Sequence, residues 1–278
     1  MAHIKFVFPV ERVGQSDEII ALLQDFPFSG FHEEEAELTA YMEERLFEQD
    51  LYEKLFYEKS IKYCISVVED KNWNEVWESD FEPVGVFREG ESSLFAWIRA
   101  SFHQPHPDAR FDLLITPKMS FGTGHHATTF QMMELMSGLD FQGKQVIDFG
   151  TGTGLLAILA EKMGASNILA IDNDDWSINN TLENIAANQC HNIDIVKAEE
   201  CISAPSPASI VLANINLNVI LDNLSKIVNS AAPEAIILFS GILSQDLDII
   251  SPAIEKSGLQ IQKIASRNNW LIIEAKKY

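Results

Sequence analysis

Short apolar runs alternate regularly with longer stretches of helical periodicity from Gln145 to Ala275. The runs have the length of β-strands, and the stretches between them have the length of α-helices. This alternation is typical of βαβ units, which build a parallel, doubly wound α/β sheet. Only residues 266–269 separate the last two runs, which is too short for a parallel crossover, so we expect an antiparallel pair there. The seven predicted strands are residues 145–149, 167–171, 193–196, 209–213, 235–239, 259–265 and 270–275, with helices at 153–163, 176–188, 217–228 and 243–256.

A glycine-rich turn, in which Asp148 precedes Gly150, Gly152 and Gly154, follows the first of these strands. Glycines permit a tight turn and let a ligand approach bare backbone at a helix N-terminus. The dinucleotide fingerprint fails when it is counted from Gly150, but counted from Gly152 its last position is Ala157, a permitted variant. Spacing alone therefore leaves a nicotinamide or flavin cofactor open. A Walker phosphate loop is excluded, because no Gly-Lys-Ser/Thr follows.

Two acidic residues narrow the choice of ligand for this turn. Asp148 would repel a pyrophosphate, but it suits a ligand that carries a positive group. Asp172 ends the next strand, 22 residues after Gly150, where a carboxylate can accept both hydroxyls of a ribose. A turn that serves only packing explains neither acid. The Asp-x-Gly-x-Gly-x-Gly pattern with Asp172 resembles class I S-adenosylmethionine-dependent methyltransferases, a resemblance that implies this cofactor and a seven-stranded sheet.

The first 69 residues predict a separate small α+β domain. Strands are expected at residues 3–8, 28–32, 36–42 and 62–68, and helices at 17–24, with Ser16 as N-cap, and at 43–58. The order β-α-β-β-α-β matches the ferredoxin-like motif. Residues 70–83 then form a predicted connector containing Trp73 and Trp77. The rest of the chain, 84–278, is the predicted methyltransferase domain. It begins with an extension, 84–126, whose strands are expected at 84–88, 94–100 and 111–115.

Charge and cysteine content restrict the partners and the compartment. The chain has 41 acidic and 20 basic residues, a net charge of −21, and the first 70 residues alone carry 16 acidic and 6 basic residues. This balance argues against nucleic acid and anionic membranes and fits a basic partner, although acidity that serves only solubility explains it equally well. Cys64, Cys190 and Cys201 form no Cys-x-x-Cys pair, and no signal peptide or long apolar span occurs, so we expect a cytoplasmic protein.

His103 and His106 lie in a proline-rich loop, but no set of acidic or cysteine ligands completes a metal site there. We therefore expect no metal.

Residues 121–129 (FGTGHHATT) predict a glycine-hinged loop and a hydroxyl-bearing helix start that could close over a ligand. The alternative is a structural loop with a capped helix. Asn214 follows the fourth strand at the edge where ligands of such sheets bind, or else caps the helix that begins near Leu217.

Three motifs together resemble the ribosomal protein L11 methyltransferase family over nearly the whole chain. They are the 121–129 segment, the glycine turn, and Asn214 between alanine and isoleucine. The resemblance implies trimethylation of lysine side-chain amines and of the N-terminal α-amine of ribosomal protein L11, with the N-terminal domain and connector recruiting that basic protein. Residues 116–120 (TPKMS) depart from the family's more usual Asp-Pro-Gly-x-Ala. The candidate cofactor-binding residues are Thr128, Thr129, Asp148, Gly150, Gly152, Gly154, Asp172 and Asn214, and the candidate catalytic residues are Phe121, Gly122, Thr123 and Asn214.

The sequence leaves two other functions open. One is a methyltransferase of the same class that acts on another protein or a small molecule, although a recruiting domain of about 70 residues favours a macromolecule. The other is a nucleotide-binding regulatory module without catalysis. For a methyltransferase, the substrate amine must lose a proton, and Asn214 is a poor base because it carries no charge. We expect solvent to take the proton, with His125 and His126 as the nearest alternative bases.

Overall fold

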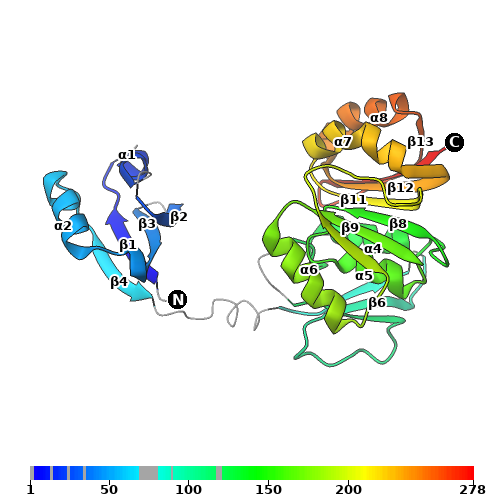
Figure 1. Ribbon diagram of the computed structural model, residues 1–278, viewed down its shortest axis with the longest axis horizontal. Coiled ribbons are helices and arrows are strands. Elements are labelled where there is room, and N and C mark those ends of the chain that lie inside the picture. The colour runs from blue at the N-terminus through cyan, green and yellow to red at the C-terminus, as the bar shows by residue number, and fades with distance from the viewer. Residues whose placement is uncertain are drawn as a thin grey trace. The chain divides into compact units, whose positions relative to one another are not determined.

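The computed structural model describes residues 3–12, 15–23, 26–33, 36–68, 81–88, 90–116 and 121–278. The chain divides into two compact units, Met1–Trp77 and Glu78–Tyr278 (Figure 1). This division falls inside the segment predicted as a connector. Of that segment, only residues 81–83 are among those described, so Trp73 and Trp77 lie outside them.

The first unit is a four-stranded antiparallel sheet with the strand order β2-β3-β1-β4, as expected for a ferredoxin-like motif. Alternate residues of β1, namely Ile4, Phe6 and Phe8, are buried, and the rings of Phe6 and Phe8 contact those of Tyr52 and Phe56. This period-two pattern is what made the strand predictable. The elements are β1 (His3–Pro9), α1 (Gln15–Leu23), β2 (Phe28–Glu33), β3 (Glu37–Glu43), the 3₁₀ turn η1 (Glu44–Leu46), α2 (Gln49–Glu58) and β4 (Cys64–Val68).

Two sequence predictions for this unit are wrong in detail. Helix α1 begins at Gln15, so Ser16 lies inside it and does not cap it. The Gln15 side chain instead accepts a hydrogen bond from the Glu11 N–H at 2.8 Å, which fixes the chain before the helix. The helix expected at 43–58 is also shorter, because Glu43 still pairs with His3 across the sheet and a 3₁₀ turn intervenes before α2.

The second unit is built on a seven-stranded sheet with the order β10-β9-β8-β11-β12-β14-β13. All pairs from β10 to β12 are parallel, and β14 pairs antiparallel with both β12 and β13, which confirms the predicted antiparallel end. From β8 the chain continues to β9 and β10 on one side and then returns to β11 on the other side of β8. The strands are β8 (Gln145–Phe149), β9 (Asn167–Asp172), β10 (Ile193–Lys197), β11 (Ala208–Asn214), β12 (Ala231–Leu243), β13 (Leu259–Arg267) and β14 (Trp270–Lys277).

Helices cover both faces of this sheet, as Figure 1 shows. Apolar residues of α7 and α8, such as Ile220 and Ile254, belong to one buried cluster. Those of α4 and α5, such as Met133 and Ile158, belong to the cluster on the other face, against which Ile185 of α6 also packs. The helices are α4 (Ala127–Met136), α5 (Leu155–Lys162), α6 (Asp175–Ala187), α7 (Leu217–Ser230), the 3₁₀ turn η2 (Ser244–Asp246) and α8 (Leu247–Lys256).

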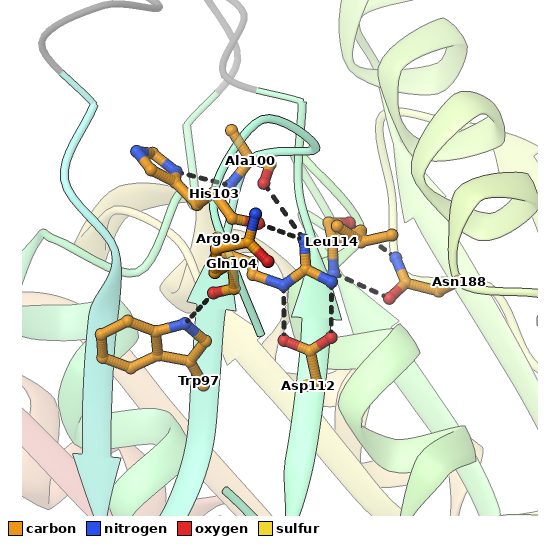
Figure 2. Close-up of polar contacts among 8 residues, drawn as sticks. All are labelled: Trp97, Arg99, Ala100, His103, Gln104, Asp112, Leu114 and Asn188. Atoms are coloured by element: carbon orange, nitrogen blue, oxygen red, sulfur yellow. Dashed lines mark hydrogen bonds and ion pairs between the residues drawn. The ribbon is translucent and has the colours of Figure 1, made fainter. Parts of the chain in front are cut away.

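A separate three-stranded sheet, β5 (Val84–Phe87), β6 (Leu94–Arg99) and β7 (Phe111–Leu114), forms the predicted extension. The buried Arg99 of β6 makes a two-pronged ion pair with Asp112 of β7, at 2.7 and 2.8 Å (Figure 2). Asn188, which follows α6, accepts from the Leu114 N–H at 2.9 Å and donates to the Leu114 carbonyl. These bonds attach the extension to the rest of the second unit.

Candidate functional site

The glycine turn between β8 and α5 fits its surroundings only without side chains. The N–H groups of Gly150 and Thr151 donate to the Ile171 carbonyl at 2.8 and 3.0 Å, so the turn is fixed to the end of β9. Gly150 and Gly152 both have positive φ, 79° and 57°. A Cβ on Gly150 would lie 2.1 Å from the Ile215 side chain, and one on Gly152 would lie 2.3 Å from the Phe121 carbonyl oxygen.

A cavity of about 480 Å³ opens beside this turn. Its walls come from the carboxyl ends of β8, β9, β10 and β11, where the strand order reverses between β8 and β11. Of the predicted site residues, Phe121, Thr128, Gly150, Gly152, Asp172 and Asn214 line it. The predicted site residues Gly122, Thr123, Thr129, Asp148 and Gly154 are not among its lining residues.

Asp172, the last residue of β9, presents its carboxylate to the cavity. One oxygen accepts the Gly152 N–H at 2.9 Å, and the other accepts the Asp174 N–H at 3.1 Å. A carboxylate oxygen has two acceptor positions, so each keeps one for a ligand. The side chain is therefore held in place by backbone donors and can still accept two hydroxyl groups.

Asp148 lies beneath the turn and is only 1% exposed. One of its oxygens accepts the Thr151 hydroxyl at 2.7 Å. Burial raises the pKa of Asp148 to about 7, the Thr151 hydrogen bond opposes that shift, and the negative charge of Asp172 adds to it. Any influence of Asp148 on a ligand must therefore pass through the turn.

Asn214 joins the end of β11 to the first turn of α4. Its side-chain Nδ2 donates to the Thr129 hydroxyl at 3.2 Å, and its Oδ1 is buried without a donor among the described residues. The alternative that Asn214 caps α7 is wrong, because Asn216 is the N-cap and accepts the Val219 N–H at 3.1 Å. Helix α4 begins at Ala127, so Thr129 lies within its first turn.

The loop that begins at Phe121 is fixed to the glycine turn by Thr153. The Thr153 N–H donates to the Phe121 carbonyl at 3.0 Å, and its hydroxyl donates to the Gly122 carbonyl at 2.6 Å. The Phe121 ring, 54% exposed, stands edge-on to His126 at 5.1 Å. The His126 ring is in turn 4.9 Å from Trp270. Phe121, His126 and Trp270 all line the cavity, and we call them the aromatic wall.

His126 is the N-cap of α4, and its Nδ1 lies 2.8 Å from the Thr128 hydroxyl. Burial lowers the pKa of His126, which favours the neutral ring. In a neutral ring Nδ1 can accept a hydrogen bond from the Thr128 hydroxyl.

Among the described residues, no group of three or more His, Cys, Asp or Glu side chains is arranged to hold a metal ion. No helix in the described ranges is long and apolar enough to cross a membrane.

Residues 14–278 match the protein family described as Ribosomal protein L11 methyltransferase (PrmA). The chain belongs to this family. A ribosomal protein L11 methyltransferase of Phocaeicola vulgatus is 34% identical over 283 residues, which cover 99% of each protein. One from Porphyromonas gingivalis is 38% identical over 264 residues, 91% of this chain and 88% of that protein.

A solved structure leads to the same family. The crystal structure of the ribosomal protein L11 methylase from Lactobacillus delbrueckii subsp. bulgaricus is 26% identical with a TM-score of 0.63, and the match covers 71% of this chain and 100% of that one. The resemblance that the sequence motifs indicated is thus confirmed.

Several cavity residues of this L11 methyltransferase family member were not predicted from the sequence. Glu199 follows β10 and Gly241 lies in β12, so the rule that ligands bind at the carboxyl ends of parallel strands would have indicated both. Trp270 is different, because it begins an antiparallel strand and reaches the same edge by pairing with Leu243 at the end of β12. The other unpredicted lining residues are Phe149, Asn173, Ser177, Ala198, Ile215, Asn216 and Val219, together with His126, which was considered only as a base.

Proposed function

We propose that this protein transfers methyl groups from S-adenosylmethionine to amino groups of ribosomal protein L11. Family membership supports the reaction class, and the printed names of the relatives supply the substrate. One observation carries the proposal: a single cavity is lined by two sets of residues. Asp172 and the glycine turn form one set, and Asn214 and the aromatic wall form the other. The first set suits a nucleoside, and the second suits an amine.

The residues present fit S-adenosylmethionine. Asp172 keeps one acceptor position on each oxygen, which matches the two hydroxyls of a ribose. Gly150 and Gly152 leave backbone exposed at the cavity, where a ligand can approach more closely than any side chain would allow. When bound, this cofactor supplies an electrophilic methyl group attached to a positively charged sulfur.

The substrate amine would be held by Asn214 and the aromatic wall. The unpaired Oδ1 of Asn214 can accept one amine N–H, which would direct the nitrogen lone pair away from it. The faces of Phe121 and Trp270 attract an ammonium group, and this attraction strengthens once water is displaced. Misplacing a reacting nitrogen by about 1 Å can cost roughly a hundredfold in rate, so these contacts would set the turnover.

The amine must be neutral when it attacks. A lysine has a pKa near 10.4 in water, and desolvation in a partly apolar cavity would lower that value. Nδ1 of His126 is already occupied by the Thr128 hydroxyl, and His125 does not line the cavity. The remaining acceptor positions of Asp172 would be taken by the two ribose hydroxyls. These contacts support transfer of the proton to solvent.

The finer assignment covers which amines are modified and how the protein substrate is captured. We infer that lysine ε-amines and the N-terminal α-amine are both accepted, because an aromatic wall recognises the ammonium group and not the chain that carries it. The excess of acidic residues in the first unit supports capture of a basic protein, since a negative surface raises the association rate of a positive partner.

The test is methylation of purified L11 with labelled S-adenosylmethionine, followed by mass spectrometry of the product. Two L11 variants separate the amines: one has its lysines replaced by arginine, and the other has a blocked N-terminus. We expect methyl groups on each variant at the amines that remain. Binding of S-adenosylmethionine without any methylation of L11 would favour the alternative, a methyltransferase of the same class with another substrate.

A further inference from the structure

Phe81 is only 5% exposed, although it lies just where the chain enters the second unit. Its ring stands edge-on to His125 with a centroid distance of 4.8 Å and lies 6.0 Å from the ring of His103. These two histidines come from different segments: His103 lies in the loop after β6, and His125 lies in the loop that leads into α4. Phe81 therefore packs between the extension and the loop beside the cavity.

The His103 side of this packing is rigid. Arg99 donates from Nη1 to the His103 carbonyl at 2.8 Å while its guanidinium is paired with Asp112 (Figure 2). The His103 ring accepts the Ala100 N–H through Nδ1 at 3.3 Å. Arg99 is largely buried, and its guanidinium group bonds both Asp112 and the His103 carbonyl. The residues that Phe81 packs against on this side are therefore held in place.

The His125 side reaches the site. Its Nε2 lies 2.8 Å from the Glu82 carbonyl, which can only accept, so Nε2 carries the proton. In the neutral ring Nδ1 then accepts the Thr123 hydroxyl at 3.2 Å. Thr123 follows Phe121 and Gly122, whose carbonyls both receive hydrogen bonds from Thr153 of the glycine turn.

We propose that His125 is a positioning residue that links the packing of Phe81 to the position of the cavity loop, residues 121–124. The inference deepens the proposed function, on which its catalytic consequence rests. Neither Phe81 nor His125 lines the cavity. The two His125 ring nitrogens nevertheless join the Glu82 carbonyl to Thr123, in the loop that carries Phe121. A change that disturbs the packing of Phe81 therefore displaces the aromatic wall without altering a cavity residue.

Hydrogen exchange of the free protein tests this coupling without any ligand or substrate. The Thr153 N–H bonds to the Phe121 carbonyl, so its exchange rate reports whether the loop is docked. We expect Phe81→Leu and His125→Ala each to raise that rate by about fivefold, the effect of losing one ordinary contact. Phe81→Leu keeps an apolar side chain at this buried position, which limits the general loss of stability. His125→Gln can still donate to the Glu82 carbonyl and should restore most of the protection.

Phe102→Ala is the matched control, because the Phe102 ring contacts His103 at 4.4 Å but has no ring contact with His125 within the described residues. It should leave the Thr153 exchange rate unchanged. In the double variant Phe81→Leu/His125→Ala the effect should not exceed that of either change alone, since both remove the same link. Faster exchange confined to residues near position 81, with Thr153 unaffected, would overturn the coupling.

Kinetics add the catalytic consequence. With L11 as substrate we expect kcat to fall about tenfold in Phe81→Leu, while the affinity for S-adenosylmethionine changes by less than about twofold, because the Asp172 carboxylate and its hydrogen bond to the Gly152 N–H lie outside this link. If the wild-type protein does not methylate L11, the proposed function fails and the exchange experiment still decides the coupling. If exchange responds but kcat does not, the loop is linked to Phe81 without a role in positioning, and the inference is wrong.

Discussion

Asn214 and Thr129, 85 positions apart in the chain, are joined by a 3.2 Å hydrogen bond in which the Asn214 amide donates to the threonine hydroxyl. The side-chain oxygen of Asn214, Oδ1, stays buried at the cavity wall, with no donor among the described residues. An unsatisfied buried acceptor costs about 1–3 kcal/mol of stability. A protein that keeps such a group at a cavity is expected to satisfy it with a ligand, and the amine of the proposed substrate is the donor that fits.

Asn214→Ala should therefore reduce turnover at least about tenfold, since it removes the group that positions the amine. The melting temperature should change little, because losing the bond to Thr129 and removing the unsatisfied oxygen have opposite effects on stability. Asn216→Ala is the comparison, as it removes the N-cap of α7 and should cost about 1 kcal/mol of stability. Normal turnover in Asn214→Ala would contradict its proposed role.

Asp172→Ala should weaken S-adenosylmethionine binding at least about tenfold by calorimetry, because a hydrogen bond to a charged acceptor contributes roughly 1.5–3 kcal/mol. The carboxylate also accepts the Gly152 N–H, so the glycine turn loses a support as well. Asp175→Ala is the matched control: Asp175 lies three residues on, pairs with Lys197 at the surface and does not line the cavity. An unchanged dissociation constant in Asp172→Ala would remove this residue from the site.

Much of this arrangement was predictable because it follows from local patterns. A short apolar run followed by the glycine turn identified β8, and the rule for parallel strand ends identified Asp172 and Asn214. Trp270 was not predictable in this way, because its place at the cavity depends on antiparallel pairing with β12. The burial of Asp148 also could not be predicted, since the same turn pattern is compatible with a carboxylate above or below the backbone. Local sequence patterns do not specify how segments that are far apart in the sequence pack against each other.

A shortened chain of residues 78–278 should still bind S-adenosylmethionine but lose most of its activity on L11. Every cavity residue lies within this range, and so does Phe81, which packs against His125. The first unit, with its acidic excess, is the part proposed to capture the basic substrate. Circular dichroism must first establish that the shortened chain is folded. Methylation of L11 at the rate of the full chain would then contradict the recruiting role.

The stability of the ligand-free protein should depend on the ionisation of Asp148. Its pKa is raised from an ordinary value of 3.8 to about 7 by burial. A raised pKa means that its contribution to stability is complete below about pH 4 and is lost as the pH rises to about 7. In urea unfolding, Asp148→Asn should therefore gain stability over the wild type across that interval, and the difference should level off above it. Asp222→Asn, an exposed change on α7, should show no such growth.

The same carboxyl provides a test of ligand charge. S-adenosylmethionine carries a positive sulfur, and a positive group bound at the glycine turn would favour the ionised form of Asp148. Because the pKa of Asp148 is near 7, binding at neutral pH should then release a fraction of a proton. Calorimetry in two buffers of different ionisation enthalpy measures that release, and Asp148→Asn should abolish it. S-adenosylhomocysteine, which lacks the sulfonium charge, should release less. Equal release by both ligands would mean that the release does not depend on the sulfonium charge, which would contradict this role of Asp148.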